Sequence, residues 1–292
     1  MPMSSTHVST TAVLLISCPD RPGLVAAVAS WVAGIGGNIV HAEQHTDVQD
    51  GMFFQRVEFT HPTGTPIDSL RQGFDAVARA WSMSYAVHPR PWRPRTAILV
   101  SKPLHCAADL LTRTTYGDLG LDVRAVVSNH RDAEALALAH GRDFHHLPVA
   151  DSAGGRRAQE SSLETLLGDL QLDLVILARY MLVLPPHIVF TWSGKMINIH
   201  HSFLPAFIGA NPYRQAHDRG VKVIGATAHY VSEVLDEGPI IAQDVASVTH
   251  RDDVTELTRR GRDLETVVLA RAVRAHVEHR VLVWNNRTVV FS

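Results

Sequence analysis

A proline-rich stretch divides the chain into two parts with different sequence patterns. Residues 88–96 read HPRPWRPRT and hold three prolines and three arginines. Because proline has no backbone N–H, this stretch cannot donate the continuous hydrogen bonds that a helix or a central strand needs. We therefore predict a linker over residues 89–95, with one domain before it (1–88) and another after it (96–292). A chain of 292 residues is long enough for two domains.

The part before the linker has the pattern of a small α/β domain. TAVLLIS is typical of a strand, and apolar residues at helical spacing follow Pro22 and end at Gly36 and Gly37. Two extended stretches then meet at Asp50 and Gly51, where we predict a hairpin turn with both residues at positive φ. A helix over 66–80 and the strand SYAVHP complete a β-α-β-β-α-β order, which predicts a ferredoxin-like module.

The part after the linker is built from short apolar runs. TAILVS, LDVRAVVSN, DLVILARY and KMINIH are candidate strands, and segments with helical periodicity separate them. Near-continuous apolar runs suit strands that are covered on both faces by helices. We therefore predict a doubly wound, mostly parallel α/β domain, which closes with a long helix in the segment that starts DDVTEL.

Charge and composition exclude several classes of protein. The formal net charge is -2 and the pI is about 6.8, so we expect no nucleic-acid partner and no membrane surface. The most apolar stretches are too short for a membrane span or carry Arg179, and no basic leader precedes the first apolar run. The two cysteines, Cys18 and Cys106, fall in different predicted domains. Free thiols in the cytoplasm fit this pattern better than a disulfide does.

Polar residues stand directly at the end of one apolar strand, in KMINIHHS. Asn198, His200 and Ser202 are expected at the carboxyl end of a parallel strand, where open sheets bind ligands. Asn198 and His200 share one side of the strand and His201 points to the other. A metal site that uses both histidines is the rival interpretation. We disfavour it because adjacent residues of a strand rarely bind one ion and no other cluster has ligand spacing.

A second polar group follows in GATAHYVSEVLDEGPI. Thr227 and His229 lie on one face of a predicted strand, and Asp236 stands in a loop beside a glycine. Taken alone, Asp236 is more often a turn residue. With Asn198 and His200 it completes a set of an amide donor, a titratable imidazole and a carboxylate. Such a set suits the stabilisation of an oxyanion on an attacked carbonyl.

The segment from Ile197 to Ile241 resembles the signature of folate-dependent formyltransferases. It has Asn-x-His at a strand end, then Ser-x-Leu-Pro, then Leu-Asp-x-Gly. The double histidine, FLPAFIGA and GATAHYV look most like the formyltetrahydrofolate deformylase branch. CPDRPGLVAAVASWVAGIGGNIV is similar to an ACT domain, and an ACT domain followed by a formyltransferase domain is the arrangement of that branch. The resemblance covers nearly the whole chain.

The resemblance implies hydrolysis of 10-formyltetrahydrofolate to formate and tetrahydrofolate, which supplies formate for purine synthesis and balances the one-carbon folate pools. It places the catalytic roles on Asn198, His200 and Asp236, with His229, Thr227 and Ser202 as supporting residues. The implied folate pocket is lined by Arg179, Tyr180, Met181, Leu182, Val183, Leu235 and Gly238, although plain core packing explains Met181 and Leu182 nearly as well. Neither a cofactor nor a metal is implied.

One loop favours water as the acceptor of the formyl group. The formyltransferase branch that acts on a phosphorylated amine holds the phosphate with a Gly/Ser/Asn-rich loop after the first strand of this domain. Here the loop reads VSKPLHCAADLL. Pro103 lacks an amide, and Leu104 and His105 replace small residues, so we predict that the phosphate site is missing.

The ACT resemblance implies a homo-oligomer and regulation by an amino acid, with glycine and methionine as the effectors that the family suggests. Asp20, Gly23 and Asn38 are the residues where such an effector would bind. The alternative for Asn38 is that it only caps the Gly36-Gly37 turn.

Three other functions are compatible with these residues. The first is formyl transfer to an amine, and the second is a non-enzymatic sensor of folate or amino acids. The third is hydrolysis of a different formyl compound on the same scaffold.

Overall fold

The computed structural model describes residues 9–206 and 212–292, which divide into two compact units. The first unit ends at Trp92 and also contains Glu278–Ser292, whereas the second unit spans Arg93–Val277. This division differs from the predicted one, in which residues 278–292 belonged to the second domain. Residues 207–211, which form part of the FLPAFIGANP motif, lie outside the described residues.

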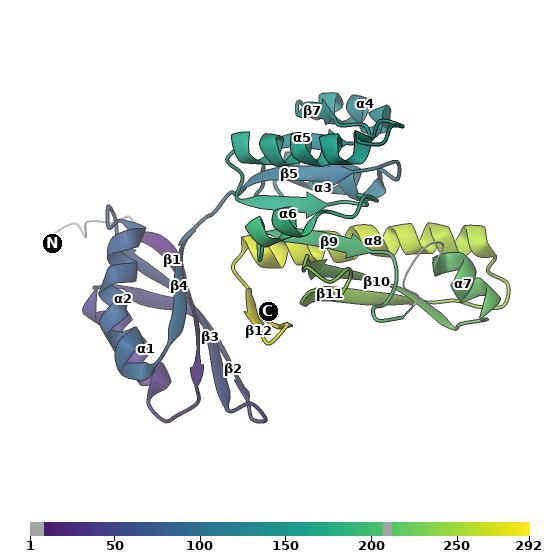
Figure 1. The fold of residues 1–292 in the computed structure, drawn as a ribbon. Coiled ribbons are helices and arrows are strands. Elements are labelled where there is room, and N and C mark those ends of the chain that lie inside the picture. Colours follow the sequence, from purple (N-terminus) through teal and green to yellow (C-terminus); the bar gives the residue numbers. More distant parts are fainter. Residues whose placement is uncertain (1–8, 207–211) are drawn as a thin grey trace, which may run out of the picture. The chain divides into compact units, whose positions relative to one another are not determined.

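The first unit is the predicted ferredoxin-like module with an added C-terminal tail (Figure 1). Its elements are β1 (Ser9–Pro19), α1 (Leu24–Gly34), β2 (Asn38–Asp47), β3 (Met52–Pro62), α2 (Ile67–Trp81), β4 (Ser84–Arg90), β12 (Val281–Trp284) and β13 (Arg287–Val290). The four N-terminal strands form an antiparallel sheet in the order β2-β3-β1-β4. β4 extends into the predicted linker and contains Pro89, which an edge strand tolerates because its outer N–H groups need no partner.

The turn between β2 and β3 is longer than predicted. Asp47 pairs with Met52, so residues 48–51 form the loop, and within it Gly51 alone has a positive φ (61°). The carboxylate of Asp47 accepts hydrogen bonds from the backbone N–H groups of Gln49 (3.0 Å) and Asp50 (3.1 Å). The prediction of positive φ at Asp50 was therefore wrong, because a side chain placed earlier organises the turn.

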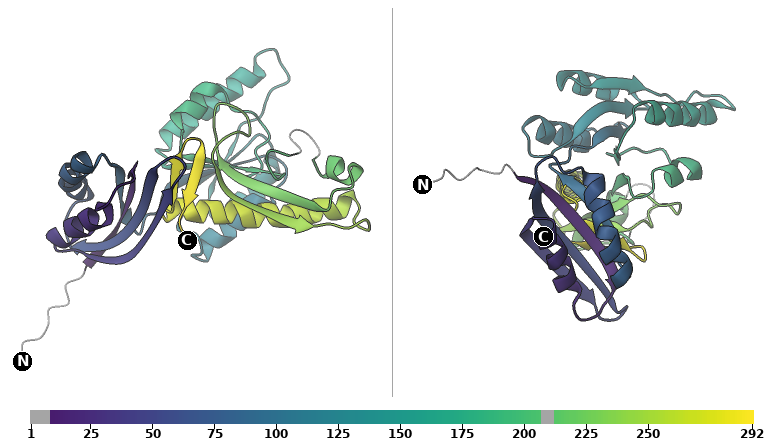
Figure 2. Two further views of the ribbon diagram at one scale, coloured as in Figure 1. Left: turned by 90° about the horizontal axis from the view of Figure 1, so that it is seen from below. Right: turned by 90° about the vertical axis from the view of Figure 1, so that its left-hand side faces the viewer.

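The C-terminal tail covers the face of this sheet that is opposite to α1 and α2. Figure 2 shows the yellow tail beside the sheet of the first unit. One apolar cluster of the unit joins both helices to the sheet, and a second cluster joins the tail to the other face through Val13, Leu15, Phe54 and Phe291. Arg56, which is 3% exposed, donates from Nε to the backbone oxygen of His279 (3.0 Å). Both faces of β1 and β3, the two central strands of the sheet, are therefore largely buried.

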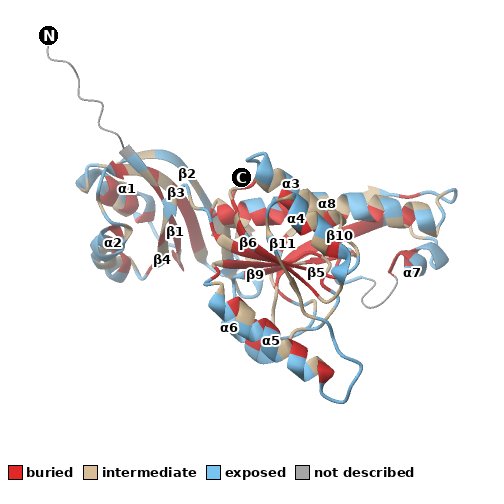
Figure 3. Cartoon of the chain, turned by 90° about the horizontal axis from the view of Figure 1, so that it is seen from above, coloured by how far each residue is buried: buried red, intermediate tan, exposed pale blue. Residues whose placement is uncertain are grey.

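The second unit is a doubly wound α/β domain, as predicted. Its elements are β5 (Arg95–Val100), α3 (His105–Thr115), β6 (Asp122–Ser128), a 3₁₀ turn (Arg131–Ala133), α4 (Glu134–Ala139), β7 (Asp143–His146), α5 (Gly155–Asp169), β8 (Leu174–Leu177), α6 (Pro186–Thr191), β9 (Met196–His200), α7 (Pro212–Asp218), β10 (Val223–Tyr230), β11 (Ile240–Ser247) and α8 (Val254–Val277). The sheet order is β11-β10-β9-β8-β5-β6-β7. β10 runs antiparallel to both of its neighbours, β9 and β11, and the remaining pairs of adjacent strands are parallel. α5 and α6 cover one face of the sheet, and α3 and α8 cover the other (Figure 3).

The chain changes direction across the sheet between β5 and β8, and open α/β sheets bind ligands at such a point. Ser101 follows β5 and Arg179 follows β8. The backbone N–H of Ser101 donates to the oxygen of Arg179 (3.1 Å), and the Ser101 hydroxyl accepts from the N–H of Met181 (3.0 Å). The two loops at this edge are thus tied together. Among the described helices, none has the length and apolar character needed to span a membrane.

We predict that Phe291→Ala destabilises the first unit by about 3–5 kcal/mol, because it empties a buried aromatic site in the tail. The measurement is the free energy of unfolding from urea denaturation. Val290→Ala is the matched control: Val290 is 42% exposed, so its truncation should change stability by less than about 0.5 kcal/mol. Equal effects of the two substitutions would contradict packing of the tail on the sheet.

Candidate active site

The register between β9 and β10 brings the predicted polar residues together. β10 runs antiparallel to β9, and it pairs His229 with Asn198 and Thr227 with His200. Side chains at paired and alternate positions point to the same face of a sheet. Residues about 30 positions apart in the chain therefore meet at the carboxyl end of β9.

Asp236 reaches His200 from the loop that follows β10. Its Oδ2 lies 3.1 Å from Nδ1 of His200, and the two side chains are 11% and 6% exposed. Burial by itself raises the pKa of Asp236, but the hydrogen bond from His200 and the charges of neighbouring histidines hold it below its usual value. Asp236 is thus an ionised carboxylate that orients the imidazole. Nε2 of His200 has no hydrogen-bond partner among the described residues, and His200 lines a cavity.

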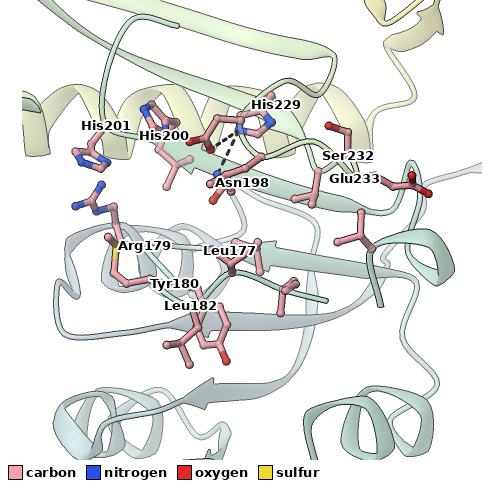
Figure 4. A pocket seen from close by; sticks show the side chains of 18 residues that line it. Leu177, Arg179, Tyr180, Leu182, Asn198, His200, His201, His229, Ser232 and Glu233 are labelled. Atoms are coloured by element: carbon pink, nitrogen blue, oxygen red, sulfur yellow. Dashed lines mark hydrogen bonds and ion pairs between the residues drawn. The ribbon is translucent and has the colours of Figure 1, made fainter. Parts of the chain in front are cut away.

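His229 fixes the orientation of the Asn198 amide (Figure 4). Nδ1 of His229 lies 2.8 Å from the backbone oxygen of Tyr230, and a carbonyl only accepts, so Nδ1 carries the proton. Burial lowers the pKa of His229, which keeps the ring neutral and leaves Nε2 as an acceptor. Nε2 lies 3.2 Å from Nδ2 of Asn198, which must therefore point its NH₂ group toward His229. The second N–H of that group remains for a ligand.

Gly238 supports this arrangement from behind. It does not belong to the cavity wall, where we had expected it as a folate contact. A Cβ at position 238 would lie 1.8 Å from the oxygen of Tyr230 and 3.2 Å from Nδ1 of His229. Any side chain here would displace the carbonyl that holds the proton of His229, so glycine is required by packing.

Thr227 and Ser202 shape the loop that leaves β9. The Thr227 hydroxyl donates to the backbone oxygen of Ser202 (2.9 Å) and accepts from the N–H of Leu204 (3.0 Å). The Ser202 hydroxyl donates to the oxygen of Ala206 (2.6 Å). Both residues are buried and neither lines the cavity, so they support the loop without facing a ligand.

A cavity of about 420 Å³ opens beside these polar groups. Its wall includes the expected residues Arg179, Tyr180, Met181, Leu182, Val183 and Leu235, together with further apolar residues, namely Leu177, Leu184, Val189, Ile199 and Val231. The loop after β8 is held to α5, because Gln159 donates to the Tyr180 hydroxyl (2.8 Å) and Arg156 donates to the oxygen of Val183. The cavity is thus mainly apolar, with Asn198 and His200 at one part of its wall and Ser232 and Glu233 at another (Figure 4).

A second cavity, of about 410 Å³, lies at the start of α3. At its inner end is Glu265 of α8, which is 1% exposed and had no signal in the sequence beyond its place in a helix. Its carboxylate lies 2.6 Å from Nε2 of His105 and accepts from the Tyr213 hydroxyl (2.6 Å), with Nε of Arg179 at 3.4 Å. Burial raises the pKa of Glu265, but the bond to His105 and the charge of Arg179 bring it below its usual value.

Among the described residues, one group has ligand atoms close enough to hold a metal ion. His105, Cys106 and Glu265 place one such atom each within 4.8 Å of one another. Sequence spacing did not reveal the group, because Glu265 comes from a distant helix. Burial, together with the charge of Glu265, raises the pKa of the Cys106 thiol well above its usual value, and a protonated thiol is a poor ligand. With Arg179 also beside Glu265, these donors suit a hydrogen-bonded cluster better than a cation.

The expected effector residues of the first unit are exposed around the start of α1 and β2. Gly23 has a φ of 99°, and a Cβ there would lie 2.8 Å from the ring of Trp81, so packing explains the glycine. Asn38 donates from its backbone N–H to the Thr60 hydroxyl (3.2 Å). Its side chain makes no hydrogen bond to the residues that the structure describes, so it does not cap the preceding turn.

Comparisons with known proteins agree over the length of the chain. The Formyl transferase family model matches residues 94–273 and the ACT domain model matches residues 12–72. A formyltetrahydrofolate deformylase of Synechocystis sp. is 49% identical over 289 residues, which is 97% of this chain and 99% of that protein. The crystal structure of a formyltetrahydrofolate deformylase from Pseudomonas syringae is 43% identical in sequence and superposes with a TM-score of 0.92. The match covers 98% of this chain and 96% of the Pseudomonas chain. A glycinamide ribonucleotide transformylase from Symbiobacterium toebii is 33% identical and covers 68% of this chain and 95% of its own, with a TM-score of 0.64.

We predict that His201 makes the protein less stable in acid. Burial, followed by the charges of Arg179 and His200, lowers the pKa of His201 to about 3. Between pH 6.5, the ordinary pKa of histidine, and about pH 3, His201 is therefore protonated in the unfolded chain but not in the folded chain. The free energy of unfolding should therefore fall by about 1.4 kcal/mol per pH unit from this group as the pH drops from about 6.5 toward 3.

Urea denaturation at pH 7 and pH 5 measures this effect. In His201→Gln the loss of stability between the two pH values should be smaller than in the wild type by about 2 kcal/mol. An identical loss in both proteins would show that His201 titrates as freely in the folded chain as in the unfolded one.

Proposed function

The chain belongs to the formyltetrahydrofolate deformylase family, and we propose that it hydrolyses 10-formyltetrahydrofolate to formate and tetrahydrofolate with Asn198, His200 and Asp236 as catalytic residues. The observation that carries this proposal is the meeting of these three side chains in the wall of the mainly apolar cavity. The 3.1 Å contact between His200 and Asp236 and the fixed amide of Asn198 supply two oriented groups for one carbonyl.

The volume of about 420 Å³ and the mainly apolar lining of the cavity suit a folate. A pterin is a flat ring system, and Met181, Leu182 and Val183 offer it apolar side chains together with the backbone of their loop. Leu235 faces the same space from the loop that carries Asp236. With the pterin among these residues, N10 and its formyl group lie toward Asn198 and His200.

The chemistry is an attack of water on the formyl carbon. The water oxygen forms a bond to carbon while Asp236 helps to accept one of its protons, and the carbonyl oxygen becomes an oxyanion. The free N–H of Asn198 and, in its protonated form, Nε2–H of His200 donate hydrogen bonds to that oxyanion. The C–N10 bond then breaks, N10 receives a proton from His200, and formate leaves with net release of one proton. No cofactor and no metal enters these steps.

The start of α3 favours water over an amine as the acceptor. Pro103, in the loop before the helix, has no N–H to offer an anion, and Leu104 is a bulky residue next to it. His105 turns its ring to Glu265 instead. This arrangement supports hydrolysis over transfer of the formyl group to a phosphorylated amine.

The proposed reaction supplies formate for purine synthesis and balances the one-carbon folate pools. Cytoplasmic location is part of the proposal, and it is supported by two cysteines that are both buried and free, as a reducing compartment favours.

We predict that the purified protein releases formate from 10-formyltetrahydrofolate without any added amine. Asn198→Ala should lower turnover by about 10²–10³, because one oxyanion donor is lost. The measurement is the rate of tetrahydrofolate and formate production. Ser193→Ala, at an exposed position before β9, is the control and should match the wild type. Near-normal turnover of Asn198→Ala would exclude the proposed oxyanion site, and formate release only with an amine would favour the transferase.

ACT domains generally bind amino-acid effectors, and we propose that glycine or methionine binds the first unit of a homo-oligomer near Asp20 and Asn38. Each amino acid should change turnover of the full chain several-fold, and Asn38→Ala should raise the concentration needed. Asp68→Ala, in an exposed side chain of α2, serves as the control. An unchanged rate with both amino acids at millimolar concentration would argue against an effector site of this kind.

A further inference from the structure

The two cavities of the second unit share part of their walls. Arg179, Met181 and His201 line both the 420 Å³ cavity at the catalytic residues and the 410 Å³ cavity at the start of α3. Figure 4 shows the guanidinium of Arg179 pointing toward the ring of His201. The ring of His201 lies 5.1 Å, between centroids, from His200 on one side and 6.3 Å from Tyr213 on the other. These shared residues thus separate the reacting centre from a second space.

The fixed charges of the two cavities differ in sign. The catalytic cavity carries two carboxylates, Glu233 and Asp236, against the single arginine Arg179. The second cavity carries Arg179, Arg214 and Arg262 against the single carboxylate of Glu265. An anion formed beside Asp236 is therefore repelled on one side of the shared wall and attracted on the other.

The two outer arginines of the second cavity have no competing partner among the residues that the structure describes. Arg214 and Arg262 are exposed at its wall and form no hydrogen bond or ion pair with any residue that the structure describes. Glu265, in contrast, is already satisfied by His105, Tyr213 and Arg179. Since Arg179 offsets the charge of Glu265, the attraction of Arg214 and Arg262 for a small anion remains.

We propose that the second cavity binds formate beside Arg214 and Arg262 and is the route by which this product leaves. The route rests on the proposed hydrolysis. It offers formate a way out while tetrahydrofolate is still in the catalytic cavity, after the C–N10 bond has broken. Formate has three heavy atoms and can pass where the folate cannot, and each step of the route brings the anion closer to an arginine.

Product inhibition tests the proposal in the intact chain. Initial rates of 10-formyltetrahydrofolate hydrolysis are measured against sodium formate at constant ionic strength. Formate should inhibit noncompetitively with respect to the folate, because it binds in a separate cavity. Each of Arg214→Gln and Arg262→Gln should raise the inhibition constant about two- to fivefold, as expected for an exposed charge, and the double variant should raise it further, with the KM for the folate unchanged.

Arg157→Gln is the matched control. Arg157 is an exposed arginine of α5, on the other face of the sheet, and it forms no ion pair with the described residues. Its substitution makes the same change in net charge and should leave the inhibition constant at the wild-type value. If the double variant behaves like Arg157→Gln, or if formate competes with the folate, the proposed route is overturned.

Binding of ¹³C-formate, followed by NMR line broadening on the resting protein, separates this proposal from the proposed function. Broadening that is lost in the double variant and kept in Arg157→Gln supports the anion site, whether or not the protein turns over. Normal hydrolysis together with equal broadening in all variants overturns the anion site and leaves the hydrolase assignment standing. Absence of formate release from 10-formyltetrahydrofolate removes the product route and the assignment together.

Discussion

The antiparallel pairing of β10 with β9 holds the polar groups of the site in place. In this register His229 stands opposite Asn198, and the loop after β10 returns Asp236 to His200. Because side chains alternate along a strand, a slip of one residue would turn His229 away from Asn198 and bury the wrong face. β8, the other neighbour of β9, runs parallel to it. Because β10 is antiparallel, it ends beside the start of β9, and the loop that follows must turn back to bring Asp236 to His200. The register of β10 and the return of this loop together assemble the site.

Burial of these polar groups is tolerated because neighbouring groups satisfy them, except for Nε2 of His200 and one N–H of Asn198, which remain for a ligand. The oxygen of Tyr230 holds the proton of His229, which leaves His229 to accept from Asn198. An amide, an imidazole and a carboxylate without such partners would each cost on the order of 1–3 kcal/mol or more when buried. Asp236 has a φ of 61°, a conformation that aspartate tolerates better than most residues. The site is thus organised before a substrate arrives, which is what electrostatic stabilisation of an oxyanion requires.

The sequence predicted those features that depend on local pattern. Asn198 and His200 follow an apolar strand directly, so both their face and their place at the sheet edge could be inferred. Features that depend on distant contacts were missed. The buried Glu265 looks like any helical residue until α8 packs beside α3, and the C-terminal tail shows no sign in its own residues that it covers the sheet of the first unit. The turn at Asp50 was predicted wrongly because the side chain of Asp47, just before the turn, accepts the hydrogen bonds that fix its backbone.

Arg179 connects the separate parts of the second unit. Its φ of 64° is unusual for arginine and costs on the order of 1–3 kcal/mol, which its surroundings must offset. The bond from the N–H of Ser101 to its backbone oxygen fixes the turn at the point where the sheet reverses order. This turn sends the next residues, from Tyr180 onward, along the apolar cavity, and it sends the guanidinium the other way, toward Glu265. The turn at Arg179 therefore lies where the wall of the apolar cavity meets the wall of the cavity that carries the arginines.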